Sequence, residues 1–218
     1  MKKRKNIITV AIDSGAAAGA GTVAKSIASH FNLFYLDTGK IYRFIGKLKI
    51  QNIKNFNYSL IKKKIKFLKI KDLQNKNLLS DEVATAASIV AKDKEIRKLV
   101  FKFQTEYAYN PPKKYNGSIL DGRDITSVVM KNAMFKFFIT ANVKTRALRR
   151  YKEYKNLNKK ISYNEVLKSI KNRDKADIQR KYSKLKKTKD STLINTNKLS
   201  KRACFLKIKS IMDRKLKA

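Results

Sequence analysis

The fold of this chain is constrained most by a short apolar run, a loop of very small residues and then a helical pattern. Residues 7–12 are β-branched and almost wholly apolar, which is typical of a central strand in a parallel sheet. Residues 14–21 are nearly all Gly, Ala or Ser, and Val23, Ile27 and Phe31 then repeat at helical spacing. This order of strand, loop and helix predicts the first unit of an α/β protein.

The rest of the chain continues the alternation of strands and helices. Further short strands are predicted at residues 34–36, 118–120, 135–139 and 192–194. Helices are predicted after Gly39, over 81–109, twice within 143–180 and from Leu199 onward. Residues 47–80 have no clear period and are interpreted as a small variable subregion. We find no internal repeat, and the length suits a single domain over residues 1–218.

The charge of the chain is extreme and comes mainly from lysine. The sequence has 53 Lys and Arg against 16 Asp and Glu, a formal charge of +37, and 42 of the basic residues are lysines. Such lysine richness beside abundant Asn and Ile often reflects genomic base composition, so we favour solvated lysine faces. A polyanionic partner is the alternative, because Lys and Arg neutralise phosphates.

The compartment is inferred from the single cysteine and from the apolar segments. Cys204 is the only cysteine, which excludes an intramolecular disulfide and fits a reducing, cytoplasmic setting. No run of about 18 apolar residues occurs, so no membrane partner is expected. The basic residues 1–5 precede an apolar run that Asp13 closes, which is too short for the core of a signal peptide.

The loop after the first strand has the composition of a phosphate cradle. Small residues let backbone N–H groups converge on oxygens, and the following helix N-terminus adds partial positive charge. The usual P-loop has a lysine where this chain has Ala20, and Ser14 occupies the place of its first glycine. By itself the loop is equally well explained as a tight structural turn.

Four segments add a specific resemblance to a known family. Residues 35–43 follow the pattern L-D-[ST]-G-x-x-Y-R, and residues 84–97 follow A-x-x-A-S-x-V-A…R. Residues 121–141 follow D-G-R-D-x-x-x-V-V…K-x-F-[IL]-x-A, and residues 173–180 follow R-D-x-x-D-x-x-R. In this order and over nearly the whole chain, they resemble the motifs of bacterial-type cytidylate kinases.

The resemblance implies a fold and a reaction. The fold is that of P-loop nucleoside-monophosphate kinases, a parallel sheet flanked by helices, with a shortened NMP-binding subregion at 47–80 and a lid at about 143–180. The reaction is transfer of the ATP γ-phosphoryl group to CMP or dCMP with Mg²⁺, in a cytoplasmic monomer. Because Ala20 replaces the lysine, a nucleotide-binding pseudo-kinase is one alternative. A basic RNA-binding protein is another, although no RNA-binding signature is present.

The resemblance also implies roles for individual residues. The ATP-binding loop would comprise Ser14, Gly15, Ala16, Ala17, Ala18, Gly19, Ala20, Gly21 and Thr22. CMP would be bound by Thr38, Arg43, Ser88, Arg97, Arg123, Asp124, Arg173, Asp177 and Arg180. Asp124, Arg97 and Ser88 would read cytosine, since a carboxylate accepts from its N4 amino group and repels the O4 of uracil. Without the motif, Ser88 is equally well explained as a packing hydroxyl.

Arginines and one carboxylate are assigned to phosphates and sugar. The resemblance places Arg43, Arg123 and Arg180 on the CMP phosphate, and Arg173 and Asp177 near the sugar. Asp121 ends an apolar strand, which suits either a carboxylate that orients Mg²⁺ or a turn residue before Gly122.

The basic segment of the expected lid supplies the remaining catalytic candidates. Arg149 and Arg150 are assigned as catalytic lid residues, and Arg146 belongs to the same run. Outside the motifs, His30 is interpreted as structural or exposed and Cys204 as a small core residue.

Overall fold

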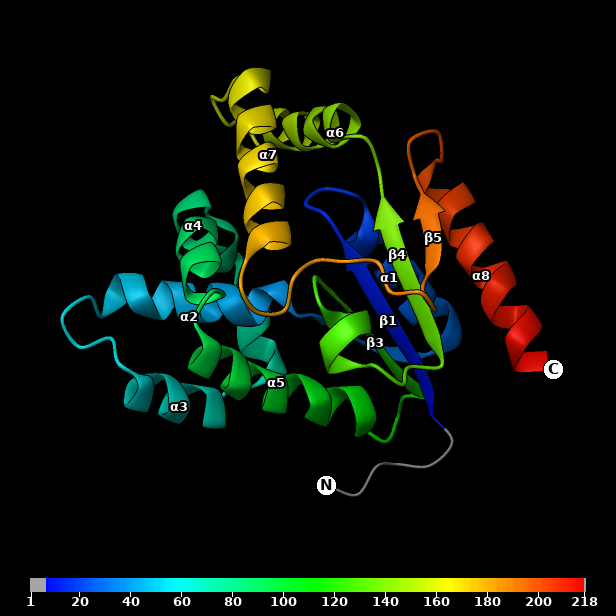
Figure 1. Ribbon diagram of the computed structural model, residues 1–218, viewed down its shortest axis with the longest axis horizontal. Coiled ribbons are helices and arrows are strands. Elements are labelled where there is room, and N and C mark those ends of the chain that lie inside the picture. Colours follow the sequence, from blue (N-terminus) through cyan, green and yellow to red (C-terminus); the bar gives the residue numbers. More distant parts are fainter. Residues whose placement is uncertain (1–6, 218) are drawn as a thin grey trace.

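The computed structural model describes residues 7–217 and is built on one five-stranded sheet (Figure 1). Its strands are β1 (Ile8–Ser14), β2 (Leu33–Asp37), β3 (Gly117–Gly122), β4 (Phe135–Thr140) and β5 (Thr192–Asn195). They lie in the order β2-β3-β1-β4-β5, and every neighbouring pair is parallel. The predicted helix-flanked parallel sheet is confirmed. The basic residues 1–5 lie outside the described part of the chain.

Helices cover both faces of the sheet, as the apolar character of β1 requires. Helices α1 (Ala20–Phe31) and α8 (Lys201–Lys217) pack on one face, and α2 (Gly39–Gln51) and α5 (Lys94–Tyr109) on the other. Val10 and Ile12 belong to the first core and Ala11 to the second, and all three are fully buried. A central strand buried on both sides needs apolar residues at successive positions, not alternate ones.

The region between β2 and β3 is more structured than its sequence suggested. Residues 47–80 hold the last turn of α2, then α3 (Tyr58–Lys66) and two 3₁₀ helices, η1 (Ile70–Gln74) and η2 (Lys76–Leu79). The helical pattern predicted over 81–109 is confirmed, and the structure divides it into two helices, α4 (Asp81–Val90) and α5. The second helix begins at its own cap, where Asp93 accepts a hydrogen bond from the Ile96 N–H.

Helix α4 lies unusually close to α2. A Cβ atom on Gly46 would lie 2.7 Å from the backbone nitrogen of Ala87, so only glycine permits this approach. The contact places α4 on the face of the sheet that α2 covers, near the carboxyl end of β2.

Helices α6 (Val143–Asn156) and α7 (Tyr163–Gln179) stand above the carboxyl ends of the strands (Figure 1). They share a small core of their own, made by Ala147, Val166 and Ile170. A short π-helix, η3 (Ile125–Val129), follows β3 and was not predicted. Among residues 7–217, no helix is long and apolar enough to span a membrane.

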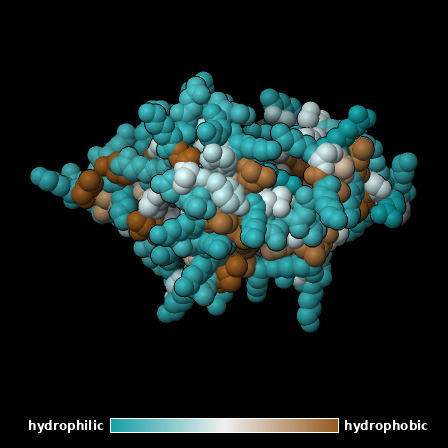
Figure 2. Space-filling view, turned by 90° about the horizontal axis from the view of Figure 1, so that it is seen from above, coloured by the Kyte–Doolittle hydropathy of each residue, from teal (hydrophilic) through white to brown (hydrophobic). Residues whose placement is uncertain are grey.

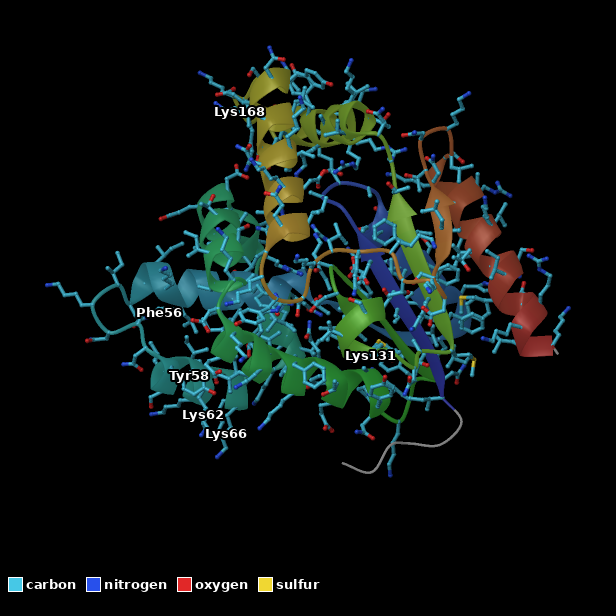
Figure 3. The ribbon with its side chains drawn as sticks, viewed as in Figure 1. Phe56, Tyr58, Lys62, Lys66, Lys131 and Lys168 are labelled. Carbon is cyan, nitrogen blue, oxygen red and sulfur yellow. The ribbon has the colours of Figure 1, made fainter. Side chains whose placement is uncertain are left out.

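The lysines are spread over the surface. Lys62 and Lys66 on α3, Lys131 after η3 and Lys168 on α7 are all exposed and lie on different parts of the molecule (Figure 3). Hydrophilic side chains also dominate the face seen in Figure 2, with only scattered hydrophobic spots. These four lysines therefore do not belong to one basic patch.

Candidate functional site

Two cavities meet over the carboxyl ends of β1, β2 and β3. The larger, of about 720 Å³, lies around the small-residue loop and is called the loop cavity here. The smaller, of about 270 Å³, is lined by many arginines and is called the arginine cavity. Asp37, Asp121, Arg123 and Arg150 line both cavities. In open α/β sheets this edge is the usual place for ligands.

The loop cavity gathers eight of the nine residues predicted to bind ATP. These are Ser14, Gly15, Ala17, Ala18, Gly19, Ala20, Gly21 and Thr22. The loop turns through left-handed backbone at Ala17 (φ 58°) and Gly19 (φ 93°). Helix α1 then begins at Ala20, two residues earlier than its periodicity indicated, and within residues 7–217 no side chain caps it. Its first N–H groups are therefore free for an anion.

Ala16 is the predicted loop residue that does not line the cavity. It is buried, and its carbonyl accepts a 2.9 Å hydrogen bond from Arg146 Nη1. Arg146 also donates to the Ala141 carbonyl and forms an ion pair with Asp174 (Nη2–Oδ2, 2.5 Å). Arg146, itself buried, thus ties the loop to α6 and α7.

The two predicted catalytic arginines both line the loop cavity. Arg149 donates to the carbonyl and the hydroxyl of Thr196, at 2.6 and 3.0 Å, which fixes its guanidinium beside the loop. Arg150 pairs with Glu153 at 3.0 Å and lies over the ring of Tyr154. Because Arg150 borders both cavities, it lies where the two cavities meet.

The arginine cavity gathers all nine residues predicted to bind CMP. They are Thr38, Arg43, Ser88, Arg97, Arg123, Asp124, Arg173, Asp177 and Arg180. They come from five regions, α2 with its preceding turn, α4, α5, the segment after β3 and the end of α7.

One end of the arginine cavity is a buried acid–base pair. Arg97 Nη2 lies 2.5 Å from Asp124 Oδ2, its Nη1 donates to the Ala91 carbonyl, and the Tyr42 ring lies beneath the guanidinium. Ser88 borders the same end, while its hydroxyl donates to the Ala84 carbonyl within α4. A carboxylate beside a guanidinium presents acceptors and donors together, which suits the edge of a pyrimidine.

The opposite side of the cavity is strongly positive. Burial and the neighbouring Arg123 lower the pKa of Arg173 to about 10, and burial and Arg150 lower the pKa of Arg43. In the described part of the chain, no carboxylate lies within ion-pair distance of Arg43 or Arg173. Arginines whose pKa is lowered by burial and by neighbouring guanidinium groups form a site prepared for an anion.

Asp177 holds two further arginines of the cavity in place. Arg123 Nε lies 2.7 Å from its Oδ2, and Arg180 Nη1 lies 3.5 Å from its Oδ1. Arg180 Nε also donates to the Ser183 carbonyl, and Thr38 donates to the Asp121 carbonyl at 2.8 Å. The bonds to Asp177 and Ser183 fix the guanidinium groups of Arg123 and Arg180 at the wall of the cavity.

Asp121 lies where the two cavities meet, next to a second carboxylate. The register of β2 and β3 pairs Asp37 with Asp121 directly, and the hydroxyl of Tyr35 donates to Asp121. Burial and the charge of Asp37 raise the pKa of Asp121 to about 8. Within residues 7–217, its Oδ1 atom is buried without a hydrogen-bond partner. An unpartnered buried oxygen is available to a cation or to ordered water.

Sequence reasoning missed several residues that shape this site. Asp13 is fully buried at the end of β1 and accepts from the Ile125 and Thr126 N–H groups and from the Thr126 hydroxyl. It holds η3 against β1, and burial raises its pKa to about 6. Its place at the end of an apolar strand, like that of Asp121, was the available signal. Tyr42 and Asp174 are fixed positions of the motifs at residues 36–43 and 173–180, but neither was given a role in the site.

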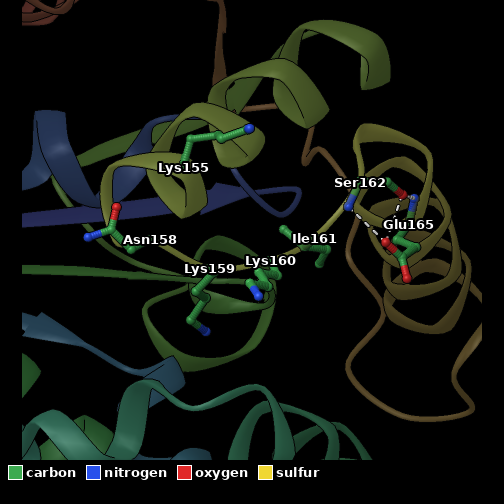
Figure 4. Close-up of a pocket in the computed structure, with 7 residues that line it drawn as sticks. All are labelled: Lys155, Asn158, Lys159, Lys160, Ile161, Ser162 and Glu165. Carbon is green, nitrogen blue, oxygen red and sulfur yellow. Dashed lines mark hydrogen bonds between the residues drawn. The ribbon is translucent and has the colours of Figure 1, made fainter.

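A third cavity lies in the connection between α6 and α7, away from the predicted residues (Figure 4). Its lining residues are Lys155, Asn158, Lys159, Lys160, Ile161, Ser162 and Glu165. Ser162 and Glu165 form the capping box that begins α7, so the N–H groups there are already occupied. His30 and Cys204 fit their interpretations, His30 being exposed against Phe31 and Phe205, and Cys204 buried.

The sheet is parallel and flanked by helices. At its carboxyl edge lie a small-residue loop, which leads into an uncapped helix, and an arginine-lined cavity. These features define a P-loop kinase-like protein. The family model for cytidylate kinase matches residues 10–214. Cytidylate kinase of Bartonella tribocorum is 40% identical over 207 residues, covering 94% of each chain. That of Clostridium botulinum (strain Langeland) is 36% identical and covers 95% of this chain and 98% of its own. The chain therefore belongs to the cytidylate kinase family.

Solved structures support the fold alone. An uncharacterized protein from Eubacterium ventriosum superposes with a TM-score of 0.56 at 17% identity, covering 94% of this chain and 98% of that one. A sugar kinase from Janibacter sp. superposes with a TM-score of 0.50 at 10% identity, covering 95% of each chain.

Proposed function

We propose that this protein transfers the γ-phosphoryl group of ATP to CMP or dCMP, giving ADP and CDP or dCDP. The observation that carries the proposal is the arginine cavity, which joins a buried Arg97–Asp124 pair to a cluster of arginines and opens beside the phosphate loop. Membership of the cytidylate kinase family supports the same reaction. We further propose that the protein acts in the cytoplasm as a monomer.

CMP would enter the arginine cavity with its base toward Asp124. The N4 amino group of cytosine donates to Asp124, Arg97 serves its acceptors, and Ser88 borders the base. Uracil presents an O4 acceptor to the same carboxylate and is disfavoured. Arg43, Arg123 and Arg180 would bind the phosphate, and Arg173 and Asp177 would contact the sugar. Planar guanidinium groups match phosphate oxygens better than lysine does.

ATP would place its phosphates along the loop, against the first N–H groups of α1. Ser14, Gly15 and residues 17–22 supply neutral donors, while Arg149 and Arg150 approach from α6. The acceptor phosphate is largely ionised at neutral pH, so proton removal needs little help. The enzyme would act by aligning the two phosphates and neutralising their charge.

The residues at the meeting point of the cavities suit Mg²⁺. Asp121 offers a buried oxygen without a partner in the described part of the chain, Asp37 stands beside it, and Thr22 offers a hydroxyl. Oxygen donors of this kind are those that Mg²⁺ prefers. Residues 7–217 contain no cluster of three or more His, Cys, Asp or Glu able to hold a metal. Mg²⁺ would be held mainly by the nucleotide, and it neutralises charge on the transferring phosphoryl group.

A coupled assay with ATP, Mg²⁺ and each of CMP, dCMP, UMP and AMP tests the proposal. We expect turnover with CMP and dCMP and a much lower kcat/KM with UMP and AMP. Nucleotide binding without turnover would instead identify a pseudo-kinase, the outcome to which Ala20 points. Absence of both binding and turnover would reject the proposal altogether.

A further inference from the structure

The loop cavity lacks the cation that a P-loop normally carries at its helix N-terminus. Ala20 occupies that position, in the first turn of α1, and its methyl group is buried in the core beneath the loop. The β- and γ-phosphates of a donor nucleotide would therefore meet no ammonium group from this position. Transferring a phosphoryl group without neutralising these oxygens is strongly disfavoured.

The arginines of the cavity are already engaged by other groups. Arg123 pairs with Asp177, Arg149 is held by Thr196, and Arg150 pairs with Glu153. Lys25 on α1 also lines the loop cavity. Within residues 7–217, no carboxylate lies within ion-pair distance of it.

The position of Lys25 on α1 directs it toward the loop. Residues four apart share one face of a helix, and helical side chains lean toward the N-terminus. Gly21, four residues earlier, faces the meeting point of the cavities, because a Cβ there would lie 3.4 Å from Asp121 Oδ2 and 3.3 Å from the Tyr35 hydroxyl. Four residues of helix rise about 6 Å, which the four-carbon stem of a lysine can span.

We infer that Lys25 replaces the missing P-loop lysine and neutralises the β- and γ-phosphates of ATP from one turn further along α1. This inference rests on the proposed kinase function and names a catalytic residue for it. Gly21 has no side chain, so the path of the Lys25 stem along this face of α1 is open. A cation at position 25 therefore reaches the region that a lysine at position 20 would occupy.

Three variants test the inference, Lys25→Ala, the double variant Ala20→Lys with Lys25→Ala, and Lys62→Ala as a control. Lys62 is exposed on α3, so its removal changes the net charge equally but leaves the cavity intact (Figure 3). We measure kcat, affinity for a non-hydrolysable ATP analogue, affinity for CMP and the thermal unfolding midpoint.

Lys25→Ala is expected to lower kcat about 10²-fold, as loss of one preorganised charge does. Affinity for the ATP analogue should fall about tenfold or more, while CMP affinity and the unfolding midpoint stay unchanged. Restoring a lysine at position 20 should recover most of both losses, and Lys62→Ala should match the wild type.

Two results would overturn the inference. One is unchanged kcat and ATP-analogue affinity in Lys25→Ala. The other is a loss that the lysine at position 20 fails to recover, because Lys25 would then act through Asp121. If the wild type binds both nucleotides but shows no turnover, the proposed function fails, and ATP-analogue affinity alone still decides the role of Lys25.

Discussion

The two cavities at the carboxyl edge of the sheet are built from different parts of the chain. On one side the loop cavity is lined by Gly, Ala, Ser and Thr of a single loop, whereas the residues predicted to bind CMP in the arginine cavity are mostly charged and come from five regions. Backbone N–H groups are supplied by any residue, so the loop can carry Ala20 and still present donors. A guanidinium fork cannot be replaced by another side chain, and the proposed phosphate contacts are arginines in a chain with 42 lysines.

The largest expected effect comes from the arginine that joins the two cavities. Arg150→Ala should lower kcat about 10²-fold or more, because it removes a charge positioned between donor and acceptor phosphates. Arg149→Ala should also lower kcat about 10²-fold, with less change in the KM for CMP, since Arg149 borders only the loop cavity. Steady-state kinetics on both variants provide the test. If Arg150→Ala kept the wild-type kcat, the charge of Arg150 would not be needed where the two cavities meet.

The next largest effect is expected from a variant that tests whether the planar shape of a guanidinium group or only its charge matters in the arginine cavity. Arg43→Lys keeps the charge and removes the fork, so the KM for CMP should rise about 10- to 100-fold while the KM for ATP is unchanged. Arg202→Lys on the exposed surface of α8 is the matched control. Near-native kinetics in Arg43→Lys would show that the arginine cavity needs only positive charge at this position and not a guanidinium fork.

Base selectivity gives an effect of intermediate size. Asp124→Asn should reduce the preference for CMP over UMP by about 1–3 kcal/mol, because an amide offers a donor or an acceptor to the base. The ratio of kcat/KM for the two substrates is the measurement, since it does not depend on the amount of folded protein. An unchanged ratio would assign base reading to other residues.

The carboxylate between the cavities predicts a pH dependence of stability. The pKa of Asp121 is raised to about 8, so the native state holds a proton that the unfolded state has released above about pH 4. The free energy of unfolding without nucleotide should therefore fall as the pH rises from about 4 to 8. Asp13, with a pKa of about 6, contributes only to the lower part of this window.

Asp121→Asn separates these two contributions. The variant should lose the pH dependence between about 6 and 8 and keep the part that Asp13 produces at lower pH. Denaturant unfolding at each pH provides the measurement. An unaltered slope in the variant would mean that Asp121 is ionised in the free protein.

The smallest effect concerns the backbone of the loop. Ala17 adopts a φ of 58°, which costs an L-residue about 1–2 kcal/mol, and its methyl group packs against the α6–α7 core. Ala17→Gly relieves the strain but loses that contact and gains entropy in the unfolded chain. We expect a net stabilisation of about 0.5 kcal/mol, or about 1–2 °C in Tm by thermal unfolding. A decrease in Tm would show that the methyl contact outweighs the strain.

Much of the fold and of the candidate site could be predicted locally. The apolar run at 7–12, the loop that follows and the short strands after it indicated a parallel sheet, because burial on both faces demands that pattern. The order of strands also predicts that residues after β1, β2 and β3 share one edge. Seventeen of the eighteen residues expected to contact ATP or CMP line the two cavities, and Ala16 is the exception.

The sequence alone determined which residue types stand at the ends of the predicted strands. It could do so because periodicity and motifs are properties of residues that are neighbours in the chain. Tertiary structure decided which charges meet. Arg146 braces Ala16 and Asp174, Asp13 anchors η3, and Lys25 and Asp121 line the same cavity. Most of these contacts join residues far apart in the chain, and all of them depend on side-chain direction and burial. Both arise only when the helices pack on the sheet, so no local pattern records them.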